Sequence, residues 1–218
     1  GWLAVNVITG TLLLVSLFSI INVKKSSVTT AVALVIFGGL VVLSGLLKED
    51  TLAKIQTWLS WIFGILTVLI LVLFLLKAKW QEAFSLPSGS WITGVLPAVS
   101  IVAAGSGISW SMAAADWGAY VTKKTKPSAT FWNTTMGGAV PLFVLMAGGV
   151  LLSTIEPSLA TTGDPFGVMY SALPTWIGPI YFLVAAGGLI PQCIISFRSA
   201  RINLATIGIN VTQRTSLM

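Results

Sequence analysis

Long apolar segments without charge alternate with short polar ones along the whole chain. Six segments contain no Asp, Glu, Lys or Arg. They cover residues 2–23, 27–47, 55–76, 91–115, 136–155 and 174–197. At about 1.5 Å of rise per residue, each can cross the roughly 30 Å hydrocarbon core of a bilayer as a helix. Segments of about ten residues with alternating polarity, which would predict a membrane barrel, are missing. The pattern predicts an all-α, multi-pass membrane protein with six transmembrane helices and a polar tail at residues 198–218.

Composition agrees with this pattern and excludes whole classes of chemistry. Of the 218 residues, 56% are hydrophobic and 8% are charged, whereas a soluble domain carries about 25% charged residues. Histidine is absent and Cys193 is the single cysteine. Histidine general bases, histidine-bound metals or haem, and disulfide frameworks are therefore excluded. We expect neither an enzyme activity nor a cofactor.

The net charge of +6 comes from twelve basic residues that lie between the apolar segments. The odd-numbered loops hold four of them, and the even-numbered loops and the tail hold eight. By the positive-inside rule, the even loops and the tail face the cytoplasm, and the loop at residues 156–175, which has no basic residue, is external. The charge thus indicates a cell membrane (plasma or inner membrane) and its lipid bilayer as the environment, not a nucleic acid.

The fourth segment, residues 91–115, is interrupted well inside its apolar span. Gly94, Pro97 and the run Gly105-Ser106-Gly107 all disfavour a regular helix there. Backbone polar groups released by such a break are tolerated at membrane depth only where they line a cavity or are buried in protein. Transporters build substrate sites from broken helices of this kind. Close packing between helices is the alternative explanation for the glycines.

Polar and aromatic side chains inside or beside the apolar segments are further candidates. Trp2 and Asn6 lie four residues apart on one helix face, where an indole and a carboxamide suit a planar heterocycle. In the last segment, Pro191 removes an amide donor and Gln192 adds a carboxamide. Interfacial anchoring of Trp2 and helix-to-helix hydrogen bonding of Gln192 are the alternatives. Asp116, at the cytoplasmic end of the fourth segment, favours a gating or capping role.

A series of short motifs extends over nearly the whole chain. In order, they are Gly1-Trp2-Leu3-Ala4-Val5-Asn6, Ile55-Gln56-Thr57-Trp58, Ser109-Trp110, Ala115-Asp116-Trp117-Gly118-Ala119-Tyr120, Phe131-Trp132, Pro141 and Pro191-Gln192. This order resembles the purine-cytosine permease branch of the nucleobase:cation symporter family. The most specific piece is the Ala-Ala-Asp-aromatic-x-x-Tyr signature, which a basic loop at residues 122–127 follows.

The resemblance implies a LeuT-like fold of twelve helices with two inverted five-helix repeats, of which the six segments would be helices three to eight. The chain is then expected to be a middle fragment, and the missing helices of the parent chain are its partners. The implied substrate-binding residues are Trp2, Asn6, Gly105, Gly107, Trp110 and Gln192. The implied gating or structural residues are Gln56, Asp116, Tyr120 and Pro191.

Together these features predict a secondary active transporter that imports a nucleobase, of the cytosine or purine type, with a proton or a sodium ion. The base would stack on Trp110 and Trp2 while Asn6 and Gln192 read its hydrogen-bonding edge. Free backbone amides at residues 105–107 would bind a carbonyl group of the ligand. The alternative is a six-helix structural or assembly subunit of a membrane complex, in which the glycines serve packing and the amides join helices.

Overall fold

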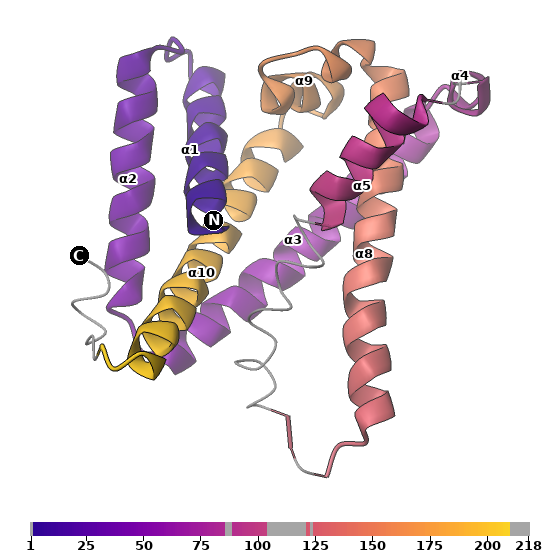
Figure 1. The fold of residues 1–218 in the computed structure, drawn as a ribbon. Coiled ribbons are helices and arrows are strands. Elements are labelled where there is room, and N and C mark those ends of the chain that lie inside the picture. Colours follow the sequence, from indigo (N-terminus) through magenta and orange to yellow (C-terminus); the bar gives the residue numbers. More distant parts are fainter. Residues whose placement is uncertain (1, 86–88, 104–120, 123, 210–218) are drawn as a thin grey trace. The chain divides into compact units, whose positions relative to one another are not determined.

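The computed structural model describes residues 2–85, 89–103, 121–122 and 124–209, and every regular element among them is helical (Figure 1). The elements are α1 (Trp2–Ile20), α2 (Ser27–Gly45), α3 (Glu49–Lys77), α4 (Trp80–Ser85), the π-helical turn η1 (Trp91–Val95), α5 (Leu96–Val102), α8 (Pro127–Ile155), the 3-10 turn η3 (Pro157–Ala160), α9 (Pro165–Ala172) and α10 (Ile177–Thr206). The chain forms two compact units. One comprises Gly1–Leu76 with Glu156–Met218, and the other comprises Lys77–Ile155.

Five helices in the described part of the chain are long and apolar enough to cross a membrane. They are α1, α2, residues Thr51–Lys77 of α3, α8 and α10. These helices confirm the predicted all-helical membrane class. The expected span at residues 91–115 is described only as far as residue 103, where it contains the shorter apolar helix Trp91–Val102. The count of six spans and the LeuT-like arrangement stay predictions.

Three helices extend beyond the segments from which they were expected. Helix α3 begins at Glu49 instead of residue 55, and α8 begins at Pro127 instead of residue 136. Helix α10 continues to Thr206, so the first nine residues of the polar tail expected at residues 198–218 are helical. A charge limits how far a segment enters lipid but does not end a helix, because lysine, arginine and glutamate have good helix propensity. Gly208, with a φ of 86°, follows the end of α10 and supplies the left-handed conformation common after helices.

Two helices end earlier than expected, and the last begins later. Helix α1 ends at Ile20 instead of residue 23, and Asn22 just beyond it has a φ of 65°, a left-handed conformation that turns the chain. Helix α2 ends at Gly45 instead of residue 47. Helix α10 begins at Ile177, three residues after Pro174.

The chain does not break at Gly94 or Pro97, which corrects part of the expectation for the fourth segment. It remains helical and changes from the π-helical turn η1 to the α-helix α5 between Val95 and Leu96. Pro97 is the second residue of α5, directly after the change from the π-helical to the α-helical turn. The run at residues 105–107 lies outside the described residues.

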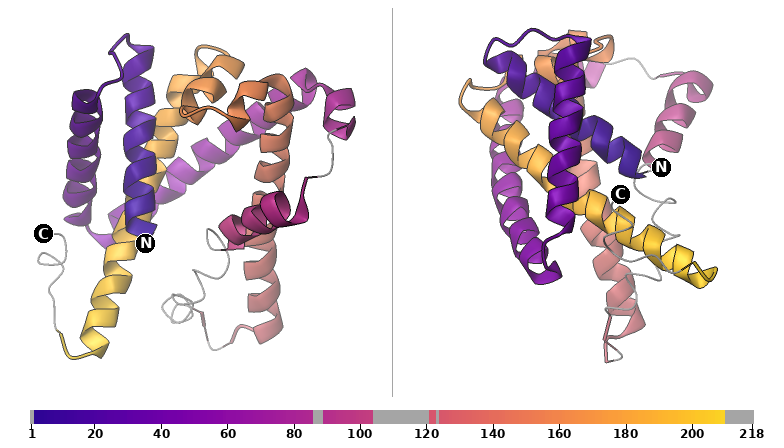
Figure 2. Two further views of the ribbon diagram at one scale, coloured as in Figure 1. Left: turned by 45° about the horizontal axis from the view of Figure 1, so that its top comes forward. Right: turned by 90° about the vertical axis from the view of Figure 1, so that its left-hand side faces the viewer.

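In the first unit, α1, α2 and α10 pack side by side around one core (Figures 1 and 2). Phe182 and Cys193 of α10 are completely buried there, and Phe37 of α2 is nearly so. The ring of Phe37 occupies the space in which a Cβ of Gly10 would lie. Helices α1 and α2 therefore approach closely only because residue 10 has no side chain.

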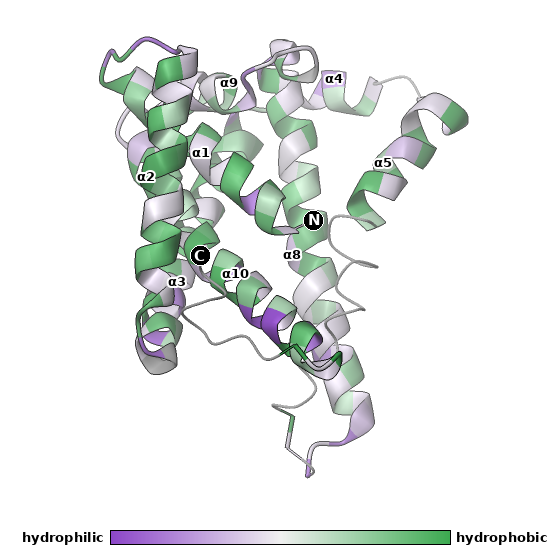
Figure 3. Cartoon of the chain, turned by 60° about the vertical axis from the view of Figure 1, so that its left-hand side comes forward, coloured by the Kyte–Doolittle hydropathy of each residue, from purple (hydrophilic) through white to green (hydrophobic). Residues whose placement is uncertain are grey.

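Apolar side chains also cover the outer sides of these helices. On α2, Val28, Val35 and Leu43 are 72%, 73% and 63% exposed, and Figure 3 shows hydrophobic colouring over much of this helix. Figure 3 also shows hydrophilic residues gathering toward the end of α10. Apolar residues on both the inner and the outer face are what a helix in a bilayer requires.

The second unit contains α4, η1, α5 and α8, and Thr154 of α8 holds the start of α4. Its Oγ1 accepts a hydrogen bond from the backbone amide of Lys79 at 3.4 Å and donates one to the carbonyl of Leu151 at 2.7 Å. Thr154 is buried. The Lys79–Glu82 ion pair, at 3.2 Å, is about half exposed, so it adds little to stability.

Thiol labelling tests the predicted topology. Ser128 lies at the exposed start of α8, and Gly163 is exposed in the loop before α9. In a Cys193→Ser background, Ser128→Cys should be protected from an impermeant thiol reagent in intact cells, because the basic loop at residues 122–127 is predicted to face the cytoplasm. Gly163→Cys should react from outside. Labelling in the opposite sense at both positions would reverse the topology.

Candidate functional site

Asn6 lies on the buried face of α1 and is only 8% exposed. Thr11 and Ser16 of the same helix are also buried. The Thr11 hydroxyl donates to the carbonyl of Val7 at 2.7 Å, so its polar group is satisfied within the helix. Within the described part of the chain, the Asn6 carboxamide has no hydrogen-bond partner. Its amide atoms are not fully enclosed, since Thr67 Oγ1 is the fully buried side-chain polar atom without a partner among the described residues.

Pro191 and Gln192 lie on α10, which packs against α1 and continues through the proline without a break. Pro191 is buried and Gln192 is half-buried. Proline has no amide hydrogen for the carbonyl four residues earlier, which leaves that acceptor outside the helical ladder. The Ser196 hydroxyl donates to the carbonyl of Gln192 at 3.0 Å, while the Gln192 carboxamide has no hydrogen-bond partner among the described residues. The structure thus places two unpaired carboxamides on two helices in contact.

The other candidates are distributed differently. Trp2 is half-buried at the beginning of α1, and Gln56 is half-buried on α3 of the same unit. The remaining candidates, Gly105, Gly107, Trp110, Asp116 and Tyr120, lie outside the described residues, and their roles stay predictions.

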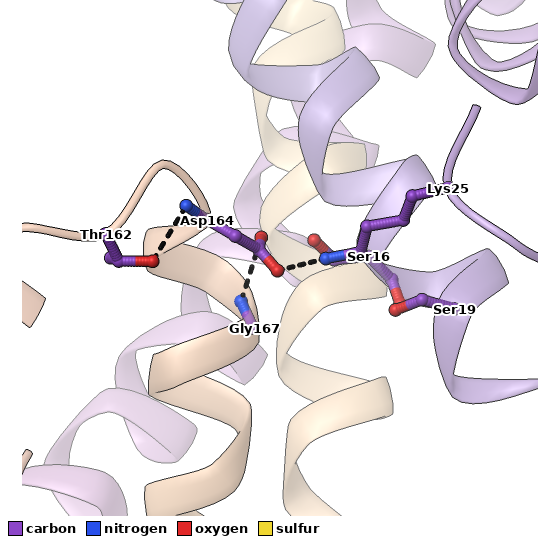
Figure 4. Close-up of polar contacts among 6 residues, drawn as sticks. All are labelled: Ser16, Ser19, Lys25, Thr162, Asp164 and Gly167. Atoms are coloured by element: carbon purple, nitrogen blue, oxygen red, sulfur yellow. Dashed lines mark hydrogen bonds and ion pairs between the residues drawn. The ribbon is translucent and has the colours of Figure 1, made fainter. Parts of the chain in front are cut away.

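A short helix that was not predicted, α9, lies inside the loop at residues 156–175, which was expected to be external. Its local signal was the pair Asp164-Pro165, a capping residue followed by a proline in the first turn. Asp164 Oδ1 accepts a hydrogen bond from the backbone amide of Gly167 at 3.2 Å. The Asp164 amide donates to Thr162 Oγ1 at 3.0 Å, as Figure 4 shows.

Asp164 also pairs with Lys25, which lies in the loop before α2 and 139 residues away in sequence (Figure 4). Their side chains are 44% and 41% exposed, so we expect the pair to contribute at most about 1 kcal/mol. A cavity of about 420 Å³ lies beside the pair. Its lining includes Ser19, Thr162, Gly167, Tyr170 and Ser171.

The long apolar helices of the described residues define the chain as a multi-pass membrane protein. Residues 1–217 match the model of a family described as permease for cytosine/purines, uracil, thiamine, allantoin, and the chain belongs to this family. This result confirms the predicted family and a multi-pass membrane location. Members bearing the name permease are transporters and not enzymes.

Two curated relatives are similar to the chain. The Bacillus subtilis (strain 168) protein YxlA, classed as a purine-cytosine permease, is 29% identical over 145 residues, which are 62% of this chain and 28% of that protein. The purine-cytosine permease FCY2 of Saccharomyces cerevisiae (strain ATCC 204508 / S288c) is 26% identical over 196 residues, which are 87% of this chain and 34% of that protein. The chain therefore spans about a third of the length of these relatives. No solved structure matches it.

Proposed function

We propose that this chain is the central part of a secondary active transporter that imports a nucleobase, of the cytosine or purine type, with a proton or a sodium ion. The observation that carries the proposal is the family match over residues 1–217. Both curated relatives are named as purine-cytosine permeases, which supports the same substrate class. Since the matches cover about a third of each relative, transport belongs to the whole protein, in which further helices are the partners of this chain.

In this proposal Asn6 and Gln192 bind the hydrogen-bonding edge of the base. A carboxamide offers two donors and one acceptor, so it can form paired hydrogen bonds with a ring nitrogen and a neighbouring exocyclic group. The burial of Asn6 and the absence of partners for both amides among the described residues support this assignment. The base would satisfy groups that the described part of the chain leaves unpaired.

Stacking and backbone contacts complete the proposed site. Trp110 and Trp2 would cover the faces of the ring, and stacking is worth about 1 to 3 kcal/mol per base. Backbone amides at Gly105 and Gly107 would donate to a carbonyl of the ligand, as unwound helix segments do in other transporters.

Gln56, Asp116, Tyr120 and Pro191 are proposed as gating or structural residues. The LeuT-like arrangement supplies the mechanism, in which one helix bundle rocks against the other around a fixed site. The carbonyl that Pro191 leaves outside the α10 ladder makes that helix easier to bend at this position.

Uptake measurements test the proposed function. Cells that express the full-length protein receive labelled cytosine, adenine, guanine, hypoxanthine or uracil, with thiamine and allantoin as further family substrates. We expect saturable uptake of at least one base, and an imposed proton or sodium gradient should stimulate it in vesicles. Failure to accumulate any base above control cells would contradict the proposal. Uptake of thiamine or allantoin alone would reassign the substrate.

A further inference from the structure

The beginning of α9 is fastened by polar contacts of one residue. Asp164 caps the helix through the Gly167 amide, binds Thr162 through its own amide, and pairs with Lys25 beside α2 (Figure 4). The first two interactions shape the loop and the helix start, whereas the third joins this loop to the α1–α2 connection. A single carboxylate therefore couples the local structure of α9 to the α1–α2 connection.

Aromatic packing fastens the rest of α9 to α10. The ring of Tyr170 occupies the position that a Cβ of Gly178 would take, so the two helices approach closely there. Phe166 meets the edge of Phe182 at a centroid distance of 6.0 Å and an interplanar angle of 74°, and Phe182 is completely buried. Such aromatic pairs stabilise a contact beyond the area that they bury. Apolar contacts thus attach α9 to α10, and polar contacts attach its start to the α1–α2 connection.

The end of α8 belongs instead to the other unit. Thr154, the penultimate residue of α8, accepts the hydrogen bond from the Lys79 amide, and the boundary between the units falls between Ile155 and Glu156. Glu156 has φ −126° and ψ 83°, outside the helical region. It precedes Pro157, and a residue before proline is disfavoured in the α conformation. The helix must therefore end where the chain passes from one unit to the other.

We propose that α9 and η3 form a rigid brace of the unit built on α1, α2 and α10, and that the connection from α8 bends at Ile155–Glu156 when the two units move relative to one another. Bending at residues 173–176 is opposed because it would separate Tyr170 from Gly178 and Asp164 from Lys25. The identity of the ligand that drives the movement depends on the proposed function, whereas the brace itself does not depend on it.

Distance measurements between spin labels test the brace in the full-length protein with Cys193→Ser. One pair, Ser27→Cys with Ser158→Cys, joins the start of α2 to η3 within the unit. The second pair, Ser27→Cys with Thr135→Cys, joins α2 to α8. All three positions are exposed.

On addition of a transported base with its coupling ion, we expect the second distance to shift and the first to stay within its ligand-free distribution. A shift of the first pair as large as that of the second, or no shift of either pair in a protein that transports, would overturn the proposal.

A variant that needs no ligand separates this proposal from the transport function. Asp164→Ala removes the cap and the ion pair together, so the distribution for Ser27→Cys with Ser158→Cys should broaden. The matched control Glu82→Gln breaks the exposed pair with Lys79 in the other unit and should leave that distribution unchanged. An unchanged distribution in Asp164→Ala would refute the brace even if uptake is normal. Absence of uptake with a broadened distribution would refute only the transport function.

Discussion

Asn6→Ala and Gln192→Ala in the full-length protein should each weaken binding of the base by about 1 to 3 kcal/mol, roughly 5- to 150-fold in affinity. Each change leaves a polar edge of the bound base without a partner in a dry pocket. Competition by unlabelled bases measures the effect. Because different bases present different hydrogen-bonding edges, these two variants should also alter the order in which bases compete. Trp110→Ala removes a stacking surface instead, so it should weaken the binding of all bases by a similar amount, about 1 to 3 kcal/mol.

Stability of the ligand-free protein distinguishes a ligand contact from a packing role for Asn6. If its carboxamide has no partner in the protein, Asn6→Ala should not lower the melting temperature, because no internal hydrogen bond is lost. Asn203→Ala is the matched control for Gln192→Ala, since Asn203 is exposed on the same helix. Variants that are unstable while the surviving protein binds bases normally would show that these side chains serve packing, even though the family assignment stands.

Gly10→Ala should destabilise the first unit by about 1 to 3 kcal/mol, the usual cost of overpacking a core. The added methyl group would fall on the ring of Phe37, which is only 1% exposed and would have to shift. The rate or temperature of unfolding in detergent measures this loss. Asn6 lies four residues earlier on the same helix, so a displaced α1 should also reduce affinity for the base.

Two further variants control for this effect. Gly39→Ala on α2 adds the same methyl group where no atom lies within 4 Å, and it should be neutral or stabilise by up to about 1 kcal/mol. Phe37→Leu should restore part of the stability lost in Gly10→Ala, because the smaller side chain makes room for the methyl group. Equal stability of the Gly10→Ala and Gly39→Ala proteins would show that α1 and α2 can move apart without a loss of stability.

The membrane class of the protein was determined by the sequence alone. Segments of about 20 residues without charge can satisfy their backbone groups in lipid only as helices, so hydropathy along the chain is enough to predict them. The family was likewise readable, because the order of short motifs is preserved in the linear sequence. The ends of the helices could not be predicted from the sequence, because charged residues indicate where the lipid ends and not where a helix ends. The true limits of α8 and α10 depend on local signals at Pro127 and Gly208.

Only the tertiary structure decided which groups meet. Nothing in the sequence pairs Lys25 with Asp164, which are 139 residues apart, or places the ring of Phe37 against Gly10. Trp2 and Asn6 were predicted to share a face from helical periodicity, yet burial of Asn6 depends on the neighbouring helices. Periodicity and hydropathy are local properties of a chain, whereas close approach, burial and pairing are properties of segments that meet only after folding.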